Sequence, residues 1–152
     1  MTETRTANTP PQTLMIVEDE ALVAIVLREV LTEAGYIVLD LTTRHVQALE
    51  VARDTKPDLA LVNIRLAGGD DGIELAEKLK ALDIPVVFIS GQTSRARSAD
   101  TVAIGSMPKP YDADEMVLAV ADLLARLKGP TDLSKPENLQ VFTEDLGTPP
   151  PA

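Results

Sequence analysis

The hydrophobic pattern alternates short apolar runs with longer stretches in which apolar residues recur every three to four positions. Short runs that end in a polar residue are typical of strands buried on both faces, and the longer spacing is typical of helices that cover such a sheet. Repeated strand–helix units joined by right-handed crossovers form a doubly wound parallel sheet, so we expect an α/β fold with five strands. The pattern predicts strands at 14–17, 36–41, 59–63, 86–89 and 105–108 and helices at 21–34, 43–56, 71–82, 93–103 and 112–128.

The two ends of the chain differ in composition from the middle. Residues 1–12 are polar and contain a pair of prolines, so we expect a disordered segment. Residues 13–128 contain all the predicted elements and form one domain. Residues 129–152 are rich in proline, and we expect a tail that is disordered or docks on a partner. The apolar residues available for docking are Leu133, Leu139, Val141, Phe142 and Leu146.

Composition and charge exclude several functions. The formal net charge of −10 disfavours binding to nucleic acid, which depends on neutralising phosphates with Lys and Arg. Without cysteine there is no disulfide or thiolate chemistry. No run approaches the roughly 20 apolar residues that span a membrane, and the first residues lack the apolar core of a secretory signal, so we expect a cytoplasmic protein. His45, the only histidine, has no cluster of possible metal ligands around it and reads as a helix surface residue.

Polar residues follow four of the five predicted strands. They are Glu18-Asp19, Asn63, Ser90 and Lys109. The carboxyl ends of parallel strands share one edge of the sheet, so these side chains are expected to meet in one crevice. Carboxylate oxygens suit Mg²⁺, and an ammonium and a hydroxyl suit phosphoryl oxygens. Taken alone, the acid pair is explained equally well as favourable charge at a helix N-terminus, and it is the combination that predicts a pocket.

Residues 13–128, about three quarters of the chain, resemble the receiver domain of two-component response regulators. The resemblance rests on Glu18-Asp19, Ser90-Gly91 and Lys109-Pro110. It implies a flavodoxin-like fold with strand order 2-1-3-4-5 and a cis peptide bond between Lys109 and Pro110. The segment Phe88-Ile89-Ser90-Gly91 also resembles the motif Phe-Ala-Thr-Gly-Tyr, which marks a subfamily of stand-alone receivers at this position.

The resemblance also implies roles for individual residues. In this family, an Asp at the end of the third strand accepts a phosphoryl group from a histidine kinase, and nearby acids bind Mg²⁺. By position, the magnesium site would comprise Glu18, Asp19, Asn63 and the backbone carbonyl of Arg65. The phosphoryl-binding and switching positions would be Ser90, Gly91, Ser106, Lys109 and Pro110.

Asn63 departs from the family at the phospho-acceptor position. A neutral carboxamide is not nucleophilic enough to form an acyl phosphate, so we expect no phosphorylation at residue 63. Its lack of charge should also relax the neighbouring acids and weaken Mg²⁺ binding. Two explanations stay open: a natural pseudo-receiver, or an ordinary receiver that carries an Asp-to-Asn substitution. Asp70 or Asp71 could substitute as acceptor, although helix capping is the favoured role of both.

Ser106 is a second departure, because the family usually has an aromatic residue there that swings inward on activation. Tyr111 is expected to pack in the core. The resulting hypothesis is a non-enzymatic, single-domain receiver that works by binding proteins, and the alternative is a flavodoxin-like module that binds a small molecule. The resemblance implies docking on a histidine kinase or phosphotransfer protein through the first helix and the loops 64–71 and 108–112. The tail could add a homodimer contact.

Overall fold

A six-stranded sheet forms the centre of the protein, seen here in a computed structural model that describes residues 10–91, 93–129 and 135–142. The strand order is β2-β1-β3-β4-β5-β6, and the first five strands are parallel. The predicted order 2-1-3-4-5 is therefore confirmed. The strands are β1 (Thr13–Val17), β2 (Ile37–Val38), β3 (Leu59–Asn63), β4 (Val86–Ser90), β5 (Gly105–Pro108) and β6 (Gln140–Val141).

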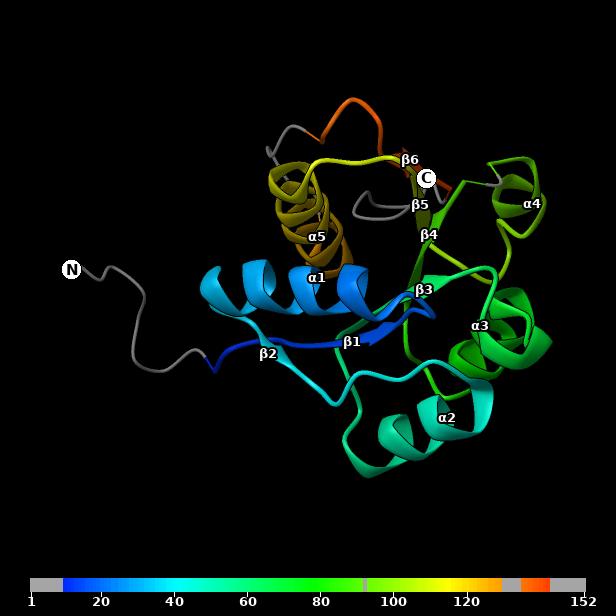
Figure 1. The fold of residues 1–152 in the computed structure, drawn as a ribbon. Helices are drawn as coiled ribbons and strands as arrows, with labels where there is room; N and C mark the ends of the chain where they lie inside the picture. The colour runs from blue at the N-terminus through cyan, green and yellow to red at the C-terminus, as the bar shows by residue number, and fades with distance from the viewer. Residues whose placement is uncertain (1–9, 92, 130–134, 143–152) are drawn as a thin grey trace.

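Helices cover both faces of the sheet (Figure 1). One apolar cluster joins the sheet to α1 and α5, and a second joins it to α2, α3 and α4. β3 and β4 are buried along their whole length, as the unbroken apolar runs predicted. The helices are α1 (Ala21–Glu33), α2 (His45–Asp54), α3 (Gly72–Ala81), α4 (Thr93–Ser98) and α5 (Ala113–Lys128), with a 3-10 turn η1 at Ala67–Gly69.

Two elements are shorter than the pattern indicated. The strand expected at 36–41 is only the two-residue β2, which pairs with β1. The helix expected at 93–103 is the six-residue α4. Within α4 the described buried side chain is Ala96, and the remainder is rich in Arg and Ser. A helix with so little apolar surface gains little from packing, which limits its length.

All five predicted parallel strands are present, and the C-terminal tail adds a sixth strand that the pattern did not predict. β6 runs antiparallel to β5, with Gly105 opposite Val141 and Ser106 opposite Gln140. A strand of two residues carries almost no periodic signal, which is why the hydrophobic pattern missed it. Leu133 and Leu146, also named as docking residues, lie outside the described residues, as does most of the expected disordered N-terminal segment.

Candidate functional site

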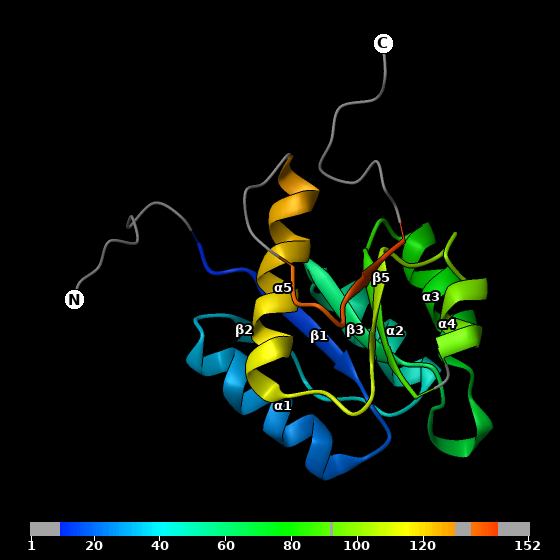
Figure 2. The same ribbon diagram turned by 90° about the horizontal axis from the view of Figure 1, so that it is seen from above.

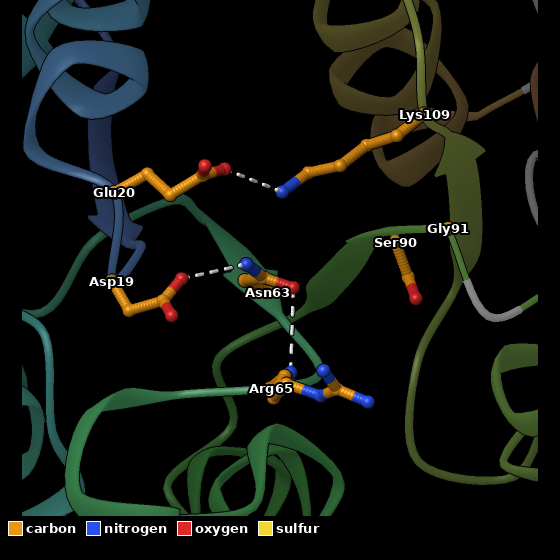
Figure 3. Close-up of a pocket in the computed structure, with 7 residues that line it drawn as sticks. All are labelled: Asp19, Glu20, Asn63, Arg65, Ser90, Gly91 and Lys109. Carbon is orange, nitrogen blue, oxygen red and sulfur yellow. Dashed lines mark hydrogen bonds and ion pairs between the residues drawn. The ribbon is translucent and has the colours of Figure 1, made fainter.

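The polar residues that end β1, β3, β4 and β5 meet around one cavity of about 450 Å³ (Figure 3). β3 places Asn63 in the middle, with the β1 end on one side and the β4 and β5 ends on the other. The convergence predicted from the strand ends is therefore present in the structure. The lining residues are Asp19, Glu20, Asn63, Arg65, Ser90, Gly91 and Lys109.

The Asn63 side chain is tied to both acids of the pair. Its amide nitrogen donates to Glu18 Oε2 at 2.8 Å and to Asp19 Oδ1 at 3.1 Å. Its amide oxygen accepts a hydrogen bond from the backbone N–H of Arg65 at 3.3 Å. Asn63 is only 7% exposed, so these partners hold a buried amide. The side chain therefore supplies donors to two acids that would otherwise repel each other.

Lys109 provides the positive charge beside these acids. Its Nζ lies 3.4 Å from Glu18 Oε1 and 3.5 Å from Glu20 Oε1. The Glu18 side chain is fully buried beneath the cavity, so this ammonium compensates a carboxylate removed from water. Sequence reasoning did not assign Glu20 to the site. The available signal was its position directly after Glu18-Asp19.

Burial changes the acid–base behaviour of two groups here. Desolvation raises the pKa of Glu18, and its hydrogen bond with Asp19 raises it further, against the lowering effects of Asn63 and Lys109. The pKa of Tyr111 is raised to about 12, first by burial and then by the negative charges of Glu18 and Glu20. Tyr111 packs against the cluster beside α1 and α5, as expected.

Gly72, the first residue of α3, fixes the backbone that carries Asn63. A Cβ at position 72 would collide with the carbonyl oxygen of Asn63 and approach the Cα of Ile64 to 2.8 Å. The Gly72 N–H donates to the Ile64 carbonyl at 2.6 Å. Only glycine leaves room for α3 to begin this close to β3. The hydrophobic pattern contains no indication of this contact between α3 and β3.

Ser106 and Pro110 lie outside the lining of this cavity. Ser106 is 2% exposed, and its hydroxyl has no hydrogen-bond partner within the described part of the chain. The peptide bond between Lys109 and Pro110 is cis, as the resemblance implied. Pro110 lines a neighbouring groove.

Asp70 and Asp71 serve the helices rather than the cavity. The Asp71 side chain accepts from the Ile73 N–H at 2.8 Å and caps α3, and it pairs with Arg95 at 2.9 Å. Asp70 accepts from the His45 N–H at 2.9 Å at the start of α2, and this hydrogen bond is the main cause of its lowered pKa. The capping role predicted for Asp71 is confirmed, and Asp70 acts on a different helix.

The acids of the pocket suit Mg²⁺ in kind, because both offer carboxylate oxygens. In the observed arrangement, however, the amide nitrogen of Asn63 takes up one oxygen of Glu18 and one of Asp19. An amide N–H cannot coordinate a cation, so its hydrogen bonds compete with a metal for the same oxygens. Among the residues that the structure describes, no group of three or more His, Cys, Asp or Glu side chains is arranged to hold a metal.

A second, apolar groove of about 570 Å³ adjoins the pocket between α1 and the start of α5. Leu22 and Val26 lie along it and are 79% and 51% exposed. Glu20 and Lys109 line both hollows. Large exposed apolar side chains grouped in this way are typical of protein-binding surfaces.

A five-stranded parallel core in this order, with acids, an amide, a hydroxyl and a lysine at the strand ends, defines a receiver-type α/β protein. The chain belongs to the response regulator receiver domain family, whose profile matches residues 14–121. It is thus a receiver domain of two-component signalling. This membership favours the receiver hypothesis over the small-molecule-binding module.

Individual relatives agree with this assignment. The chain is 29% identical over 127 residues to the transcriptional regulatory protein PdtaR of Mycobacterium tuberculosis, covering 81% of this chain and 62% of PdtaR. It is 29% identical over 116 residues to sporulation initiation phosphotransferase F of Bacillus subtilis, covering 73% of this chain and 92% of that protein. The receiver domain of NtrX from Brucella abortus superposes with a TM-score of 0.67 at 29% identity, covering 73% of this chain and 96% of that domain.

None of the helices in the described ranges is both long and apolar enough to cross a membrane.

Proposed function

We propose that this chain is a receiver that signals by binding proteins and is not phosphorylated at residue 63. The observation that carries the proposal is the central amide: Asn63 occupies the end of β3, within hydrogen-bonding distance of Glu18 and Asp19. In this reading Asn63 stands at the family's phospho-acceptor position. A carboxamide there leaves a receiver-like pocket without its nucleophile.

The same geometry supports weak Mg²⁺ binding by Glu18, Asp19, Asn63 and the Arg65 carbonyl. When bound, the metal would supply positive charge for phosphoryl oxygens. Ser90 and Lys109, with Gly91 beside them, would contact those oxygens. The affinity is lowered because the amide must release both acids before they can act as ligands, and because the pocket has one carboxylate fewer.

The partner that fits the apolar groove is a histidine kinase or phosphotransfer protein. Leu22 and Val26 present apolar area beside the pocket, so a protein docked there could bring a histidine toward Asn63 and Lys109. A homodimer through the C-terminal tail belongs to the same proposal, supported by the apolar tail residues that dock on the sheet. We also propose a cytoplasmic location, no enzymatic activity and no binding to nucleic acid; the net charge of −10 supports the last.

The test compares the chain with its Asn63→Asp variant. Both are incubated with acetyl phosphate and Mg²⁺ and analysed by intact mass and peptide mapping. The unaltered chain is expected to gain no phosphoryl mass at residue 63, and a gain there would overturn the proposal. Titration with Mg²⁺ and beryllofluoride, followed by NMR, then reports whether each pocket binds the phosphoryl analogue.

The variant also separates the two origins of Asn63. The remaining pocket residues, including Ser90 and Lys109, favour an otherwise intact receiver site, which supports the second candidate: an ordinary phospho-accepting receiver with an Asp-to-Asn substitution. Phosphorylation of the Asn63→Asp variant would support that candidate. A variant that stays unmodified and shows no shifts with beryllofluoride would support the pseudo-receiver.

A further inference from the structure

The tail segment 135–142, called here the docked tail, lies along the outer edge of β5 (Figure 2). The Phe142 N–H donates to the Ile104 carbonyl at 3.0 Å and extends the two-residue pairing of β6. The docked tail also has a turn of its own. Leu139 N–H donates to the Pro136 carbonyl at 3.1 Å, and Lys135 Nζ donates to the Leu139 carbonyl at 2.9 Å. The segment is therefore an ordered unit with a defined register on the sheet.

Apolar side chains of the docked tail straddle this edge. Leu139 is 1% exposed and belongs to the apolar cluster between the sheet and α5, against which Val141 also packs. Phe142 packs on the opposite side, against the cluster that contains Ala96 and Ala99. Both sides of the edge are thus covered by one short segment. Without it, the edge of β5 and the bed of Leu139 would be open to water or to another chain.

Gly105 shapes β5 to receive the docked tail. A Cβ at this position would lie 2.6 Å from the carbonyl oxygen of Gln140, too close for any real contact. The same Cβ would lie 3.6 Å from Leu123 Cδ2, which is ordinary van der Waals distance. The space that glycine leaves therefore accommodates the tail and is not required by the rest of the fold. This edge is therefore shaped for the main chain of the tail at Gln140, beside the buried side chain of Leu139.

We propose that the β5 edge is a docking site for this C-terminal tail, filled at rest by the chain's own copy and able to take the tail of a second copy. The inference rests on the homodimer included in the proposed function and specifies how it forms. The pairing with β5, the hydrogen bond to Ile104 and the apolar contacts join residues 135–142 to the domain, and each of these can form equally well between two chains. The covalent connection gives the chain's own tail a local concentration on the order of millimolar, so the closed monomer dominates in dilute solution.

Two substitutions in the full-length chain disrupt the tail and the β5 edge separately. Leu139→Asp places a charge on the buried residue of the tail and leaves the β5 receptor intact. Gly105→Ala closes the receptor and leaves the tail sequence intact. Each variant alone is expected to be monomeric with a released tail, seen as faster hydrogen exchange at the Phe142 amide. Their equimolar mixture is expected to form a heterodimer, because the tail of the Gly105→Ala chain can dock on the Leu139→Asp chain.

Light scattering after size exclusion and native mass spectrometry measure the masses over a range of concentrations. Leu118→Asp, which places the same charge at a 57% exposed position of α5, is the matched control and should leave the Phe142 amide protected. Circular dichroism checks that each variant is folded.

A mixture that stays monomeric although both tails are released would overturn the proposal. So would an unchanged Phe142 amide in both variants, or dimers formed by either variant alone, which would point to a different occupant of the edge. None of these outcomes affects the phosphoryl mass test at residue 63, so the two proposals can fail separately.

Discussion

The pocket around Asn63 and the apolar groove beside it are similar in size and differ in whether their side chains have partners within the protein. In the pocket around Asn63, the amide and Lys109 pair with the acids. In the neighbouring groove, Leu22 and Val26 are exposed to water. The acids of the pocket thus have internal partners, whereas the groove still has apolar surface to bury. Binding free energy for a protein partner is therefore available in the groove, whereas a ligand of the pocket must first displace internal contacts.

The largest effect is expected when the hydrogen bonds from the Asn63 amide to Glu18 and Asp19 are removed. Asn63→Asp replaces two hydrogen bonds to acids with like-charge contacts, each roughly 4 kcal/mol at about 4 Å and an effective dielectric near 20 before Lys109 offsets them. We expect a loss of roughly 2 to 4 kcal/mol in the free energy of unfolding without metal, measured by urea denaturation.

Mg²⁺ provides the internal control for that experiment. Added metal should restore most of the lost stability of the Asn63→Asp variant and change that of the unaltered chain little, because only the variant gains affinity. Equal stability of the two chains without Mg²⁺ would show that Asn63 does not relieve repulsion between the acids.

A substitution in the groove should have the opposite effect: it should weaken binding to a partner protein and leave the free energy of unfolding almost unchanged. Leu22→Asp alters a side chain that is 79% exposed, so the free energy of unfolding should change by less than about 0.5 kcal/mol. Affinity for a histidine phosphotransfer protein that binds the unaltered chain should fall at least about tenfold, measured by calorimetry.

Val46→Asp is the matched control, since Val46 is 68% exposed on α2, which does not line the groove. Equal losses of affinity in both variants would contradict the assignment of the groove as the docking surface.

The smallest effect is expected on the titration of Tyr111, which lines the groove and lies near the acids of the pocket. Its pKa is raised from 10.0 to about 12, first by burial and then by Glu18 and Glu20, so the folded protein keeps this proton in a range where the unfolded chain has released it. Stability should therefore fall as pH rises from about 10 toward about 12.

Glu20→Gln should lower the pKa of Tyr111 slightly, as followed by tyrosinate absorbance, with Tyr111→Phe identifying the signal. An unchanged titration would mean that the charge of Glu20 does not act on the Tyr111 hydroxyl.

Much of this architecture could be read from the chain because burial leaves a direct trace in sequence. β3 and β4 are apolar throughout since both faces are covered, and the polar residue after each one marks the functional edge. Asn63, Ser90 and Lys109 were found in this way. Asp71 could be assigned as a cap because capping is local.

The remaining features depend on contacts between distant segments. β6 forms because Gly105 admits the carbonyl oxygen of Gln140, and Gly72 is required because α3 begins against β3. Neither contact leaves a periodic pattern. The shape of the groove was not predicted for a similar reason: Leu22 fits the helical spacing of α1, and that spacing does not reveal that its side chain is 79% exposed beside the start of α5.

The glycine at position 72 has a practical consequence for anyone who rewrites residue 63. Gly72 packs directly against the main chain of residue 63 and so restricts its position. Replacing the amide with a carboxylate therefore changes the chemistry of the side chain and not its location. An aspartate introduced there would inherit the location of the present amide, a few ångströms from the same neighbours. Differences between the two proteins can then be attributed to charge and nucleophilicity alone.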